Sequence, residues 1–380
     1  MTQLLTVGVI GKSSKENEKR VPIHPEHVKG IPQKLREQIT FEKGYGERFG
    51  MNDDTLAKLT SGRVAVREEI LNGFDCVLLP KPLAEDLSQV REGAIVWGWP
   101  HCVQQKEITQ VSIERKLTLI AWEEMFTWSR TDEKSMHIFY KNNEMAGYAG
   151  VDHALSLTGT TGYYGKSLKA VVFSFGSVSR GAIYALQGQG VRDITVYTGR
   201  PPTEVKDQLP GISFKQVKED ASGNLLAVES DNHTRPIAEA LADVHIIVNG
   251  TLQDTAHPRM FVPGHDADKL MKGALIIDIS CDKGMGFWCA KPTSFEHPMF
   301  EAVGKFYYAV DHSPSFYWNS ASWEISKALL PFFPEVIGGT KRWEKNKTIS
   351  KSIEIRNGVI QNTKILAFQN REKEYPHKFR

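Results

Sequence analysis

The chain has 380 residues, and at about 150 residues per domain this length favours two domains. Hydrophobic residues make up 41% and charged residues 24%, as in ordinary globular proteins, and the short apolar runs exclude a membrane-spanning class. A formal net charge of +2 gives no electrostatic reason to expect a nucleic acid or a membrane as partner. We therefore expect small-molecule partners.

The two ends of the chain and its cysteines add little chemistry. Residues 1–10 run directly into a strand-like segment without a signal-peptide pattern, which predicts a cytoplasmic protein. The four cysteines form no CxxC pair, so we expect reduced thiols, no disulfide scaffold and no metal site. The last forty residues are rich in Lys and Arg, and we interpret them as a solvated face.

Short apolar runs alternate with longer helical patterns along the chain, which predicts an α/β fold. The first set of buried strands is expected at residues 6–11, 74–79, 94–98 and 117–122. A second set is expected at residues 168–175, 193–197, 244–249, 274–280 and 305–310. The pattern therefore predicts two Rossmann-like, doubly wound sheets.

Two helical patterns separate these sets. Residues 143–155 are rich in small residues, and residues 319–330 follow the second set of strands. We expect these helices to cross between the domains, with a cleft between the domains. The first domain then comprises residues 1–143 plus 320–380, and the second comprises residues 144–319. A β-hairpin is expected at residues 353–360, around an Asn-Gly pair.

A candidate nucleotide-binding turn follows the strand that ends at Phe175. It comprises Gly176, Ser177, Val178 and Ser179, and it opens an apolar helix. Ser174 and Ser179 stand where a GxGxxG pattern has its outer glycines, so a purely structural tight turn is an equal alternative. The α/β unit that follows favours a dinucleotide site, to which we also assign Asn249 and Gly250.

The end of the next strand bears on the choice of cofactor. Thr198, Gly199 and Arg200 stand where NAD-specific proteins place a carboxylate for the ribose hydroxyls. No acid is present in this loop, and Arg200 with Thr198 suits a 2′-phosphate. The loop therefore favours NADP(H) over NAD(H), and an exposed loop arginine is the alternative.

Four polar residues stand near the ends of strands in the first domain. They are Arg20, Lys81, His101 and Glu123. Each has a structural explanation by itself, as a loop cap, a solvated lysine, a core histidine or a local ion pair. Four such residues at strand ends, where α/β sheets build their sites, favour a shared catalytic site.

At these residues the sequence resembles the superfamily of alanine dehydrogenases, transhydrogenases and lysine-forming saccharopine dehydrogenases. The resemblance rests on Lys15-x-x-Glu18-x-Arg20-Val21-Pro22, Lys81-Pro82, Pro100-His101, Ala146-Gly147-Tyr148-Ala149-Gly150-Val151, Ile277-Asp278-Ile279-Ser280-Cys281-Asp282 and Gly304-Lys305-Phe306-Tyr307-Tyr308. It covers nearly the whole chain. The Ala-Gly-Tyr-Ala-Gly-Val and Gly-Lys-Phe-Tyr-Tyr blocks are typical of its carboxyethylornithine synthase branch.

The resemblance implies roles for single residues. Arg20 matches the substrate arginine, Lys81 the active-site lysine, His101 the acid/base histidine and Asp282 the catalytic aspartate of the cofactor domain. Glu123 stands where relatives also have a glutamate, and we group it with the substrate-binding residues. The residue chemistry agrees, because Arg20 and Lys81 suit the carboxylate of a 2-oxo acid. A histidine that titrates near neutrality suits the proton transfers.

These features lead to an enzyme hypothesis with two alternatives. An opine-type oxidoreductase would condense pyruvate with the side-chain amine of ornithine or lysine and reduce the imine with NADPH. One alternative is an alanine dehydrogenase, or a saccharopine dehydrogenase-like enzyme that uses 2-oxoglutarate. The other is a catalytically silent nucleotide-binding module. In each case we expect a homo-oligomer, a dimer or larger.

Overall fold

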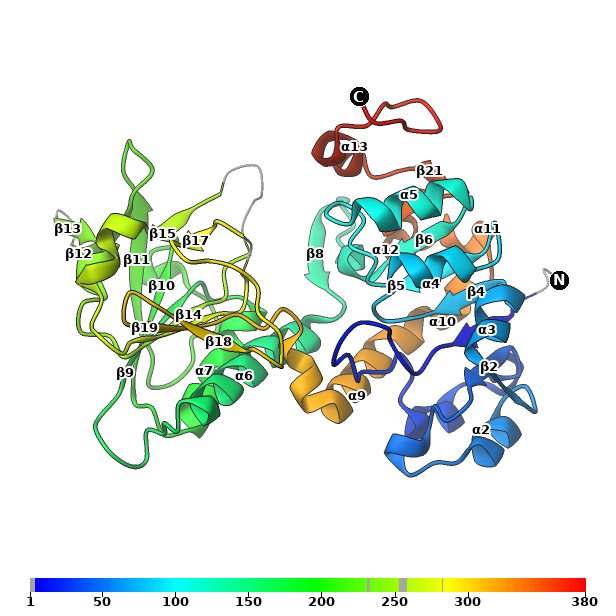
Figure 1. Ribbon diagram of the computed structural model, residues 1–380, viewed down its shortest axis with the longest axis horizontal. Coiled ribbons are helices and arrows are strands. Elements are labelled where there is room, and N and C mark those ends of the chain that lie inside the picture. Colours follow the sequence, from blue (N-terminus) through cyan, green and yellow to red (C-terminus); the bar gives the residue numbers. More distant parts are fainter. Residues whose placement is uncertain (1–3, 231–232, 253–257, 282) are drawn as a thin grey trace. The chain divides into compact units, whose positions relative to one another are not determined.

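The computed structural model describes residues 4–230, 233–252, 258–281 and 283–380. Its contacts divide the chain into two compact units (Figure 1): unit 1 is Met1–Tyr140 with Trp318–Arg380, and unit 2 is Lys141–Tyr317. The chain leaves unit 1 at the start of helix α6 (Tyr140–Leu157) and returns at the start of α9 (Trp318–Leu329). The boundaries expected from the sequence, at residues 143/144 and 319/320, lie inside these two helices.

Unit 1 is built on an eight-stranded sheet with the order β21-β20-β6-β5-β4-β1-β2-β3. Its strands are β1 (Val7–Val9), β2 (Ile39–Glu42), β3 (Val64–Ala65), β4 (Cys76–Leu78), β5 (Ile95–Gly98), β6 (Thr118–Ala121), β20 (Ile353–Arg356) and β21 (Val359–Ile360). Strands β1 to β6 pair in parallel, whereas β20 is antiparallel to both β6 and β21. The order of pairing reverses at β1, which places a topological switch point between β1 and β4.

Helices cover both faces of this sheet. Besides α9 they are α1 (Gln33–Arg36), α2 (Asp53–Leu59), α3 (Arg67–Gly73), α4 (Ala84–Gln89), α5 (Lys106–Glu114), α10 (Phe333–Ile337), α11 (Thr340–Trp343), α12 (Lys347–Lys351) and α13 (Thr363–Gln369). A separate hairpin is formed by β7 (Phe126–Trp128) and β8 (Lys134–His137). Along β4, Cys76 and Leu78 belong to one hydrophobic core and Val77 to another. Both faces of the sheet are therefore buried.

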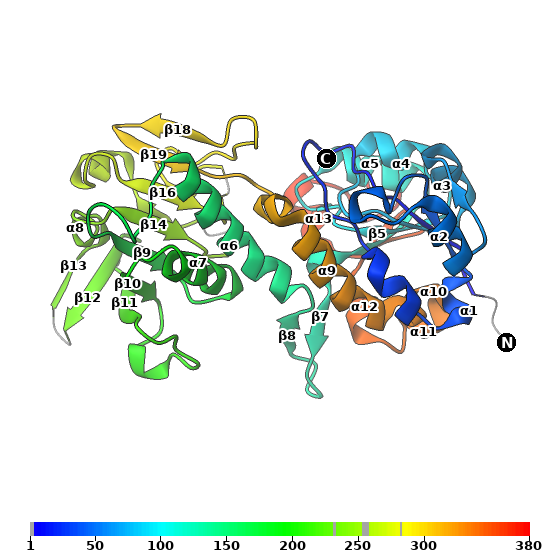
Figure 2. The same ribbon diagram turned by 90° about the horizontal axis from the view of Figure 1, so that it is seen from below.

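Unit 2 has a nine-stranded sheet with the order β13-β12-β11-β10-β9-β14-β16-β19-β18. The strands are β9 (Lys169–Phe173), β10 (Asp193–Thr198), β11 (Ser213–Glu219), β12 (Leu225–Ser230), β13 (His233–Pro236), β14 (Ile246–Asn249), β16 (Leu275–Asp278), β18 (Met299–Ala302) and β19 (Lys305–Tyr308). Its other elements are α7 (Ser177–Gly188), α8 (Ile237–Ala240) and the pair β15 (Met260–Val262) and β17 (Gly286–Phe287). Figure 2 shows α6 and α7 side by side.

The central strands of unit 2, from β11 through β10, β9, β14 and β16 to β19, pair in parallel. Their order reverses at β9, so a second switch point lies between β9 and β14. The α/β class and the two doubly wound sheets predicted from the sequence are confirmed. The antiparallel extension of β11 by β12 and β13 was not predicted.

The predicted hairpin near the C-terminus is also confirmed. Ile355 pairs with Ile360, and Arg356 with Val359. Asn357 and Gly358 have φ of 50° and 80°, the left-handed conformation that a two-residue Asn-Gly turn requires. Within the described residues, none of the helices is long and apolar enough to cross a bilayer.

Candidate functional site

The four polar residues singled out in the first domain all lie at one edge of the unit 1 sheet. Arg20 follows β1, Lys81 follows β4, His101 follows β5 and Glu123 follows β6. These strands are neighbours and parallel, so their carboxyl ends meet at the same edge. The switch point between β1 and β4 lies on this edge, which is where open α/β sheets bind ligands.

Trp99, in the loop after β5, brings two of these cations to one surface. The Arg20 guanidinium lies 5.0 Å from the centroid of the Trp99 ring, and Lys81 Nζ lies 5.8 Å from it. Trp99 is buried and packs edge-on against Trp122, with ring centroids 4.6 Å apart. Cation–π attraction favours this arrangement. Sequence reasoning did not assign Trp99 to the site, although its position directly after a strand was a usable signal.

A buried ion pair orients Arg20. Its Nε donates to Glu18 Oε1 at 2.8 Å, its Nη2 donates to Glu18 Oε2, and its backbone N–H also donates to Oε1 at 3.0 Å. Both residues are buried. A two-point contact of this kind fixes the plane of the guanidinium as well as its position.

Lys81 and His101 are in direct contact. Lys81 Nζ lies 2.8 Å from His101 Nε2. An ammonium group only donates hydrogen bonds, so with Lys81 charged we infer that Nε2 is the acceptor and Nδ1 carries the hydrogen. Nδ1 lies 3.6 Å from Glu123 Oε1, which also accepts the backbone N–H of His101 at 2.6 Å. His101 has a φ of 49°, a conformation uncommon for a residue other than glycine.

A second carboxyl group lies behind Glu123. Burial raises the pKa of Glu123, and Glu354 on β20 raises it further. Burial also raises the pKa of Glu354, whose Oε1 accepts a hydrogen bond from Asn362 at 3.0 Å. The Cys102 thiol lies near both carboxyl groups, and burial raises its pKa, which makes it a poor nucleophile. Sequence reasoning missed Glu354, although an acid between Ile353 and Ile355 in an apolar strand was a signal.

In unit 2, the predicted nucleotide turn connects β9 to α7. Ser174 has a φ of 75°, so a serine adopts the conformation that usually calls for the first glycine of the pattern. Ser179 is fully buried, and its hydroxyl donates to Phe173 O at 2.9 Å. Gly176 precedes the first residue of α7. The backbone of the turn is therefore retained with two of its three glycines replaced.

Close backbone packing holds this turn in place. A Cβ on Gly181 of α7 would lie 1.6 Å from Glu144 O on α6, and one on Gly147 of α6 would lie 1.8 Å from Val178 O. A Cβ on Gly250, after β14, would lie 2.4 Å from Ser179 Oγ. These three glycines allow the two helices and the end of β14 to approach the turn.

The turn fits the pyrophosphate of a dinucleotide. Gly176 is exposed, and among the described residues a Cβ there would meet Ser174 Oγ alone within 4 Å, at 3.8 Å. The backbone N–H groups at the start of α7, from Ser177 to Ser179, are donors suited to phosphate oxygens. The turn, at the switch point between β9 and β14, could therefore hold a pyrophosphate.

The other predicted cofactor residues lie at the same edge of the unit 2 sheet. Thr198 ends β10, and its Oγ1 accepts the Arg200 backbone N–H at 3.4 Å. Gly199 and Arg200 are exposed, and Gly199 O accepts a hydrogen bond from Gln216 at 3.0 Å. Asp282 lies outside the described residues.

Asn249 takes part in a buried network. Its Nδ2 donates to Asp278 Oδ1 at 2.8 Å, and its Oδ1 accepts the Thr251 N–H at 3.0 Å. The Tyr307 hydroxyl donates to Asp278 Oδ2 at 2.6 Å, and burial together with Asp278 raises the pKa of Tyr307. The side chain of Asn249 is thus held by its neighbours, and sequence reasoning did not identify Asp278 as its anchor.

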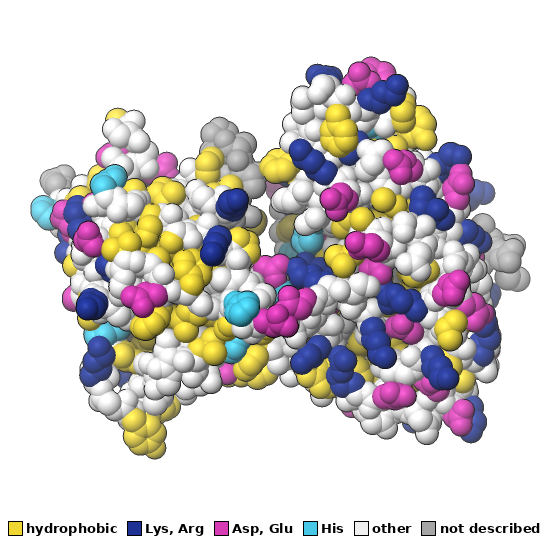
Figure 3. Space-filling view, in the orientation of Figure 1, with side chains coloured by type: hydrophobic (Ala, Val, Ile, Leu, Met, Phe, Trp, Pro, Cys, Tyr) yellow, Lys and Arg dark blue, Asp and Glu magenta, His cyan; other side chains and the backbone are white. Residues whose placement is uncertain are grey.

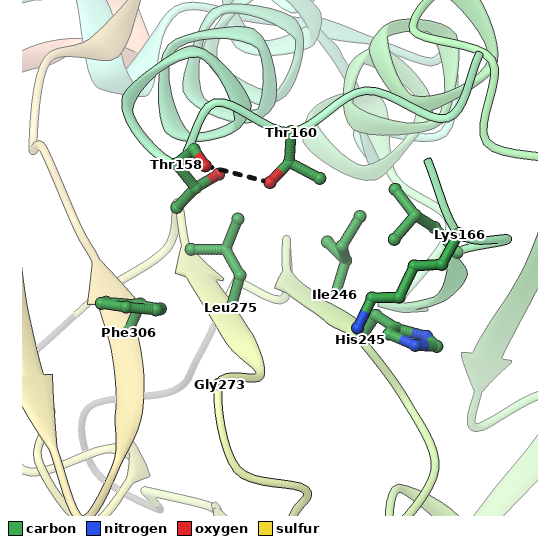
Figure 4. A pocket seen from close by; sticks show the side chains of 9 residues that line it. Thr158, Thr160, Lys166, His245, Ile246, Gly273, Leu275 and Phe306 are labelled. Atoms are coloured by element: carbon green, nitrogen blue, oxygen red, sulfur yellow. Dashed lines mark hydrogen bonds between the residues drawn. The ribbon is translucent and has the colours of Figure 1, made fainter. Parts of the chain in front are cut away.

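A separate cavity of about 150 Å³ in unit 2 lies away from these residues (Figure 4). Its lining includes Leu168, His245, Ile246, Leu275 and Phe306, which stand where β9, β14, β16 and β19 begin. This is the opposite edge of the sheet from the nucleotide turn. We do not assign this cavity to the nucleotide site.

Two family models match successive segments of the chain. Residues 9–146 match the alanine dehydrogenase/PNT N-terminal domain, and residues 169–363 match the alanine dehydrogenase/PNT C-terminal domain. Among solved structures, an L-alanine dehydrogenase has a TM-score of 0.75 at 18% identity and covers 96% of this chain and 98% of its own. A transhydrogenase from Sinorhizobium meliloti has a TM-score of 0.69 at 20% identity, with 94% and 99% covered.

Curated relatives carry two different names. An N(5)-(carboxyethyl)ornithine synthase from Clostridium botulinum is 28% identical over 84% of this chain and 94% of its own length. An enzyme of the same name from Lactococcus lactis is 23% identical, over 86% and 93%. An alanine dehydrogenase from Mycobacterium tuberculosis is 21% identical, over 94% and 95%. This chain belongs to the alanine dehydrogenase/PNT family, as an NAD(P)-type oxidoreductase that acts on amino-acid CH–NH groups.

Proposed function

We propose that this oxidoreductase is an opine-type synthase, which joins pyruvate to the side-chain amine of ornithine or lysine. The amine adds to the keto carbon, water leaves, and the imine is reduced to an N-(1-carboxyethyl) amino acid. NADPH, when bound, supplies the hydride. The names of the relatives from Clostridium botulinum and Lactococcus lactis support this substrate pair.

The carboxylate of the 2-oxo acid would bind at the Trp99 surface. Arg20 and Lys81 bring two positive charges to this one ring, and a carboxylate pairs with both a planar guanidinium and a point-charge ammonium. The ion pair with Glu18 holds the Arg20 side chain in one orientation before substrate arrives. This part of the site would therefore orient pyruvate without reorganisation.

His101 would move the protons. In the condensation, one proton leaves the attacking amine and another is given to the departing hydroxyl, and a single imidazole can do both in turn. The contact from Lys81 to Nε2 and the approach of Nδ1 to Glu123 hold the ring in one orientation. Lys81 is close enough to exchange a proton with Nε2.

The unit 2 residues would bind the cofactor. Gly176, Ser177 and Val178 would surround the pyrophosphate, and the buried Ser179, with Gly250 packed against it, would hold the turn in shape. Thr198 and the exposed Arg200 would meet the 2′-phosphate of NADPH, since residues 198–200 include no acid to bind free ribose hydroxyls.

The remaining expectations stay predictions. Asp282 is expected to hold water or the amine, or to tune His101. The substrate role of unit 1, the dinucleotide role of unit 2 and the cleft between the domains are expected on the same grounds. A homo-oligomer and a cytoplasmic location are also expected.

One observation carries the proposal: Arg20, Lys81 and His101 meet around Trp99 at the switch point of the unit 1 sheet. The test follows the loss of NADPH absorbance with pyruvate constant and with ornithine, lysine, ammonia or no amine added in parallel, and repeats each arm with NADH. We expect oxidation that requires ornithine or lysine. Oxidation with ammonia alone would instead identify an alanine dehydrogenase, the alternative that the Mycobacterium tuberculosis relative favours.

A further inference from the structure

A buried arginine near the C-terminus has only neutral partners. Arg371 is 2% exposed, and its Nε donates to Gln369 Oε1 at 2.7 Å. Its Nη1 donates to Gln110 Oε1 at 2.9 Å and to His377 O at 3.1 Å, and its third nitrogen, Nη2, is buried without a hydrogen-bond partner. No carboxylate among the described residues lies within 4.0 Å of Arg371.

The histidine beside Arg371 does not change this charge balance. His377 is buried, and its Nε2 accepts the backbone N–H of Ile360 at 3.0 Å. Its Nδ1 faces Glu372 O at 3.1 Å, where it must donate. These partners suit a neutral imidazole. The Arg371 guanidinium carbon lies 3.9 Å from the centroid of the Phe379 ring, a cation–π contact, but among the described residues the charge has no carboxylate within 4.0 Å and its nitrogens lack a full set of acceptors.

Arg371 borders an open hollow of about 430 Å³ between α13 and the last residues of the chain. The hollow is lined by Thr363, Leu366, Ala367, Asn370, Arg371, Lys373 and Arg380. Lys373 and Arg380 are exposed, and neither side chain lies within 4.0 Å of a described Asp or Glu carboxylate. Figure 1 shows this lobe next to α5 and β21, and Figure 3 shows Lys and Arg side chains on it, beside some acidic ones.

A buried charge is costly unless an opposite charge and hydrogen bonds compensate it. Burial lowers the pKa of Arg371, and no acidic neighbour opposes this effect. Glu372 and Glu374 lie in the same segment, but both are exposed. An oxyanion in the hollow would supply the missing negative charge next to the guanidinium.

We propose that this hollow binds a small oxyanion, a phosphate or carboxylate group, through Arg371, Lys373 and Arg380. The site goes beyond the proposed function, because these residues follow the end of α13 and belong to none of the strand-end loops of the candidate active site. It also replaces the solvated face that the sequence predicts for this tail.

The site is connected to the loop that carries His101. Gln369, which accepts from Arg371, donates through Nε2 to Cys102 O at 2.6 Å and to Thr109 Oγ1 at 3.2 Å. Cys102 directly follows His101. An anion that fixes Arg371 therefore also steadies this loop through Gln369.

The test is anion binding to the full chain, measured by titration calorimetry without pyruvate, amine or nucleotide. Inorganic phosphate and succinate are titrated separately at constant ionic strength, so the two arms distinguish a phosphate from a carboxylate ligand. We expect one anion per chain, and at least about tenfold weaker binding in Arg371→Met and in Arg380→Ala. Lys364→Ala, an exposed α13 lysine outside the lining, should bind like the wild type.

Two outcomes overturn the proposal: the wild type binds neither anion, or both arginine variants bind as well as the wild type. If Arg371→Met does not fold, as judged by circular dichroism, the double surface variant Lys373→Ala/Arg380→Ala is used in its place.

Hydrogen exchange tests the connection to the His101 loop. Phosphate should slow exchange of the amides of residues 102–105 in the wild type, and equal rates with and without phosphate would refute the connection. Because no substrate is present, failure of the opine reaction leaves these results unaffected.

Discussion

The two units share one architecture and differ in what stands at the edge of their sheets. In unit 1, the carboxyl ends of β1, β4, β5 and β6 present charged and titratable side chains. In unit 2, the corresponding edge at β9 and β14 presents small residues, exposed backbone and a buried network around Asp278. The topology sets where each site lies, and side-chain size and charge set which ligand it suits.

The largest effect is expected from removing His101, the proposed acid/base group of unit 1. We expect His101→Ala to lower kcat by roughly 10²-fold or more, since general acid–base catalysis contributes that much. Binding of NADPH should stay within about twofold of the wild type, because His101 belongs to unit 1. Steady-state kinetics and a fluorescence titration of the cofactor measure the two quantities.

A matched control for this variant is His265→Ala, which removes an exposed histidine of unit 2. Its activity should equal that of the wild type. Turnover of His101→Ala within a few-fold of the wild type would end the acid/base assignment.

The sequence predicts the residues of the two sites that directly follow predicted strands. It does not predict those that reach the sites through pairing of distant segments. Parallel strands bring their carboxyl ends to one edge, so Lys81, His101 and Glu123 could be grouped from their positions after apolar runs. Glu354 could not, because it lies more than two hundred residues after Glu123 and reaches it only through the antiparallel pairing of β20 with β6. Hydrophobic patterns do not encode which strand pairs at such a distance.

The sequence also did not predict the backbone conformation of individual loop residues. Ser174 adopts a positive φ although the GxGxxG pattern calls for glycine there, so the degraded motif understates how well the turn is preserved. The partners of Trp99 depend on the conformation of two loops, which no periodicity predicts. The hairpin turn was predictable, since an Asn-Gly pair favours the left-handed conformation that a two-residue turn needs.

The next effect is on the stability of unit 2. We expect Gly181→Ala to lower the free energy of unfolding by about 1–3 kcal/mol, because its Cβ would overlap Glu144 O and force α6 and α7 apart. Binding of the dinucleotide should weaken as well, since α7 begins at the turn that would hold the pyrophosphate. Urea unfolding followed by circular dichroism measures the first effect.

Gly188→Ala is the control within the same helix. A Cβ at Gly188 would meet none of the described residues within 4 Å, so alanine there should be neutral or stabilising by up to about 1 kcal/mol. Equal stability of Gly181→Ala and the wild type would contradict the close packing of the two helices.

A smaller effect should sharpen the assignment of the cofactor. We expect Arg200→Ala to reduce the preference for NADPH over NADH by about tenfold, the loss of one charge-assisted contact to a phosphate. Comparison of kcat/KM for the two cofactors measures the preference. Arg192→Ala, an exposed arginine just before β10 and at its opposite end, should leave the ratio unchanged. An unaltered ratio in Arg200→Ala would refute the 2′-phosphate contact.

The smallest effect concerns the carboxyl groups behind His101. Burial and Glu354 raise the pKa of Glu123, so Glu123 binds a proton more tightly in the folded than in the unfolded protein. Such a group stabilises the fold at low pH, and this stabilisation is lost as the pH rises through the raised pKa. Glu354→Gln removes one titrating carboxyl and lowers the pKa of the other. The fall in unfolding free energy as the pH rises above the ordinary pKa of a glutamate should therefore become shallower.

Urea unfolding at several pH values measures this slope, with Glu107→Gln, an exposed glutamate of α5, as the control. If the low-pH limb of the pH–rate profile reports Glu123, the limb should move to lower pH in Glu354→Gln. A slope equal to that of the wild type would mean that Glu354 does not share the titration of Glu123. The two carboxyl groups would then titrate separately, and Glu123 would orient the His101 loop without help from Glu354, through the 2.6 Å hydrogen bond that it accepts from the His101 backbone N–H.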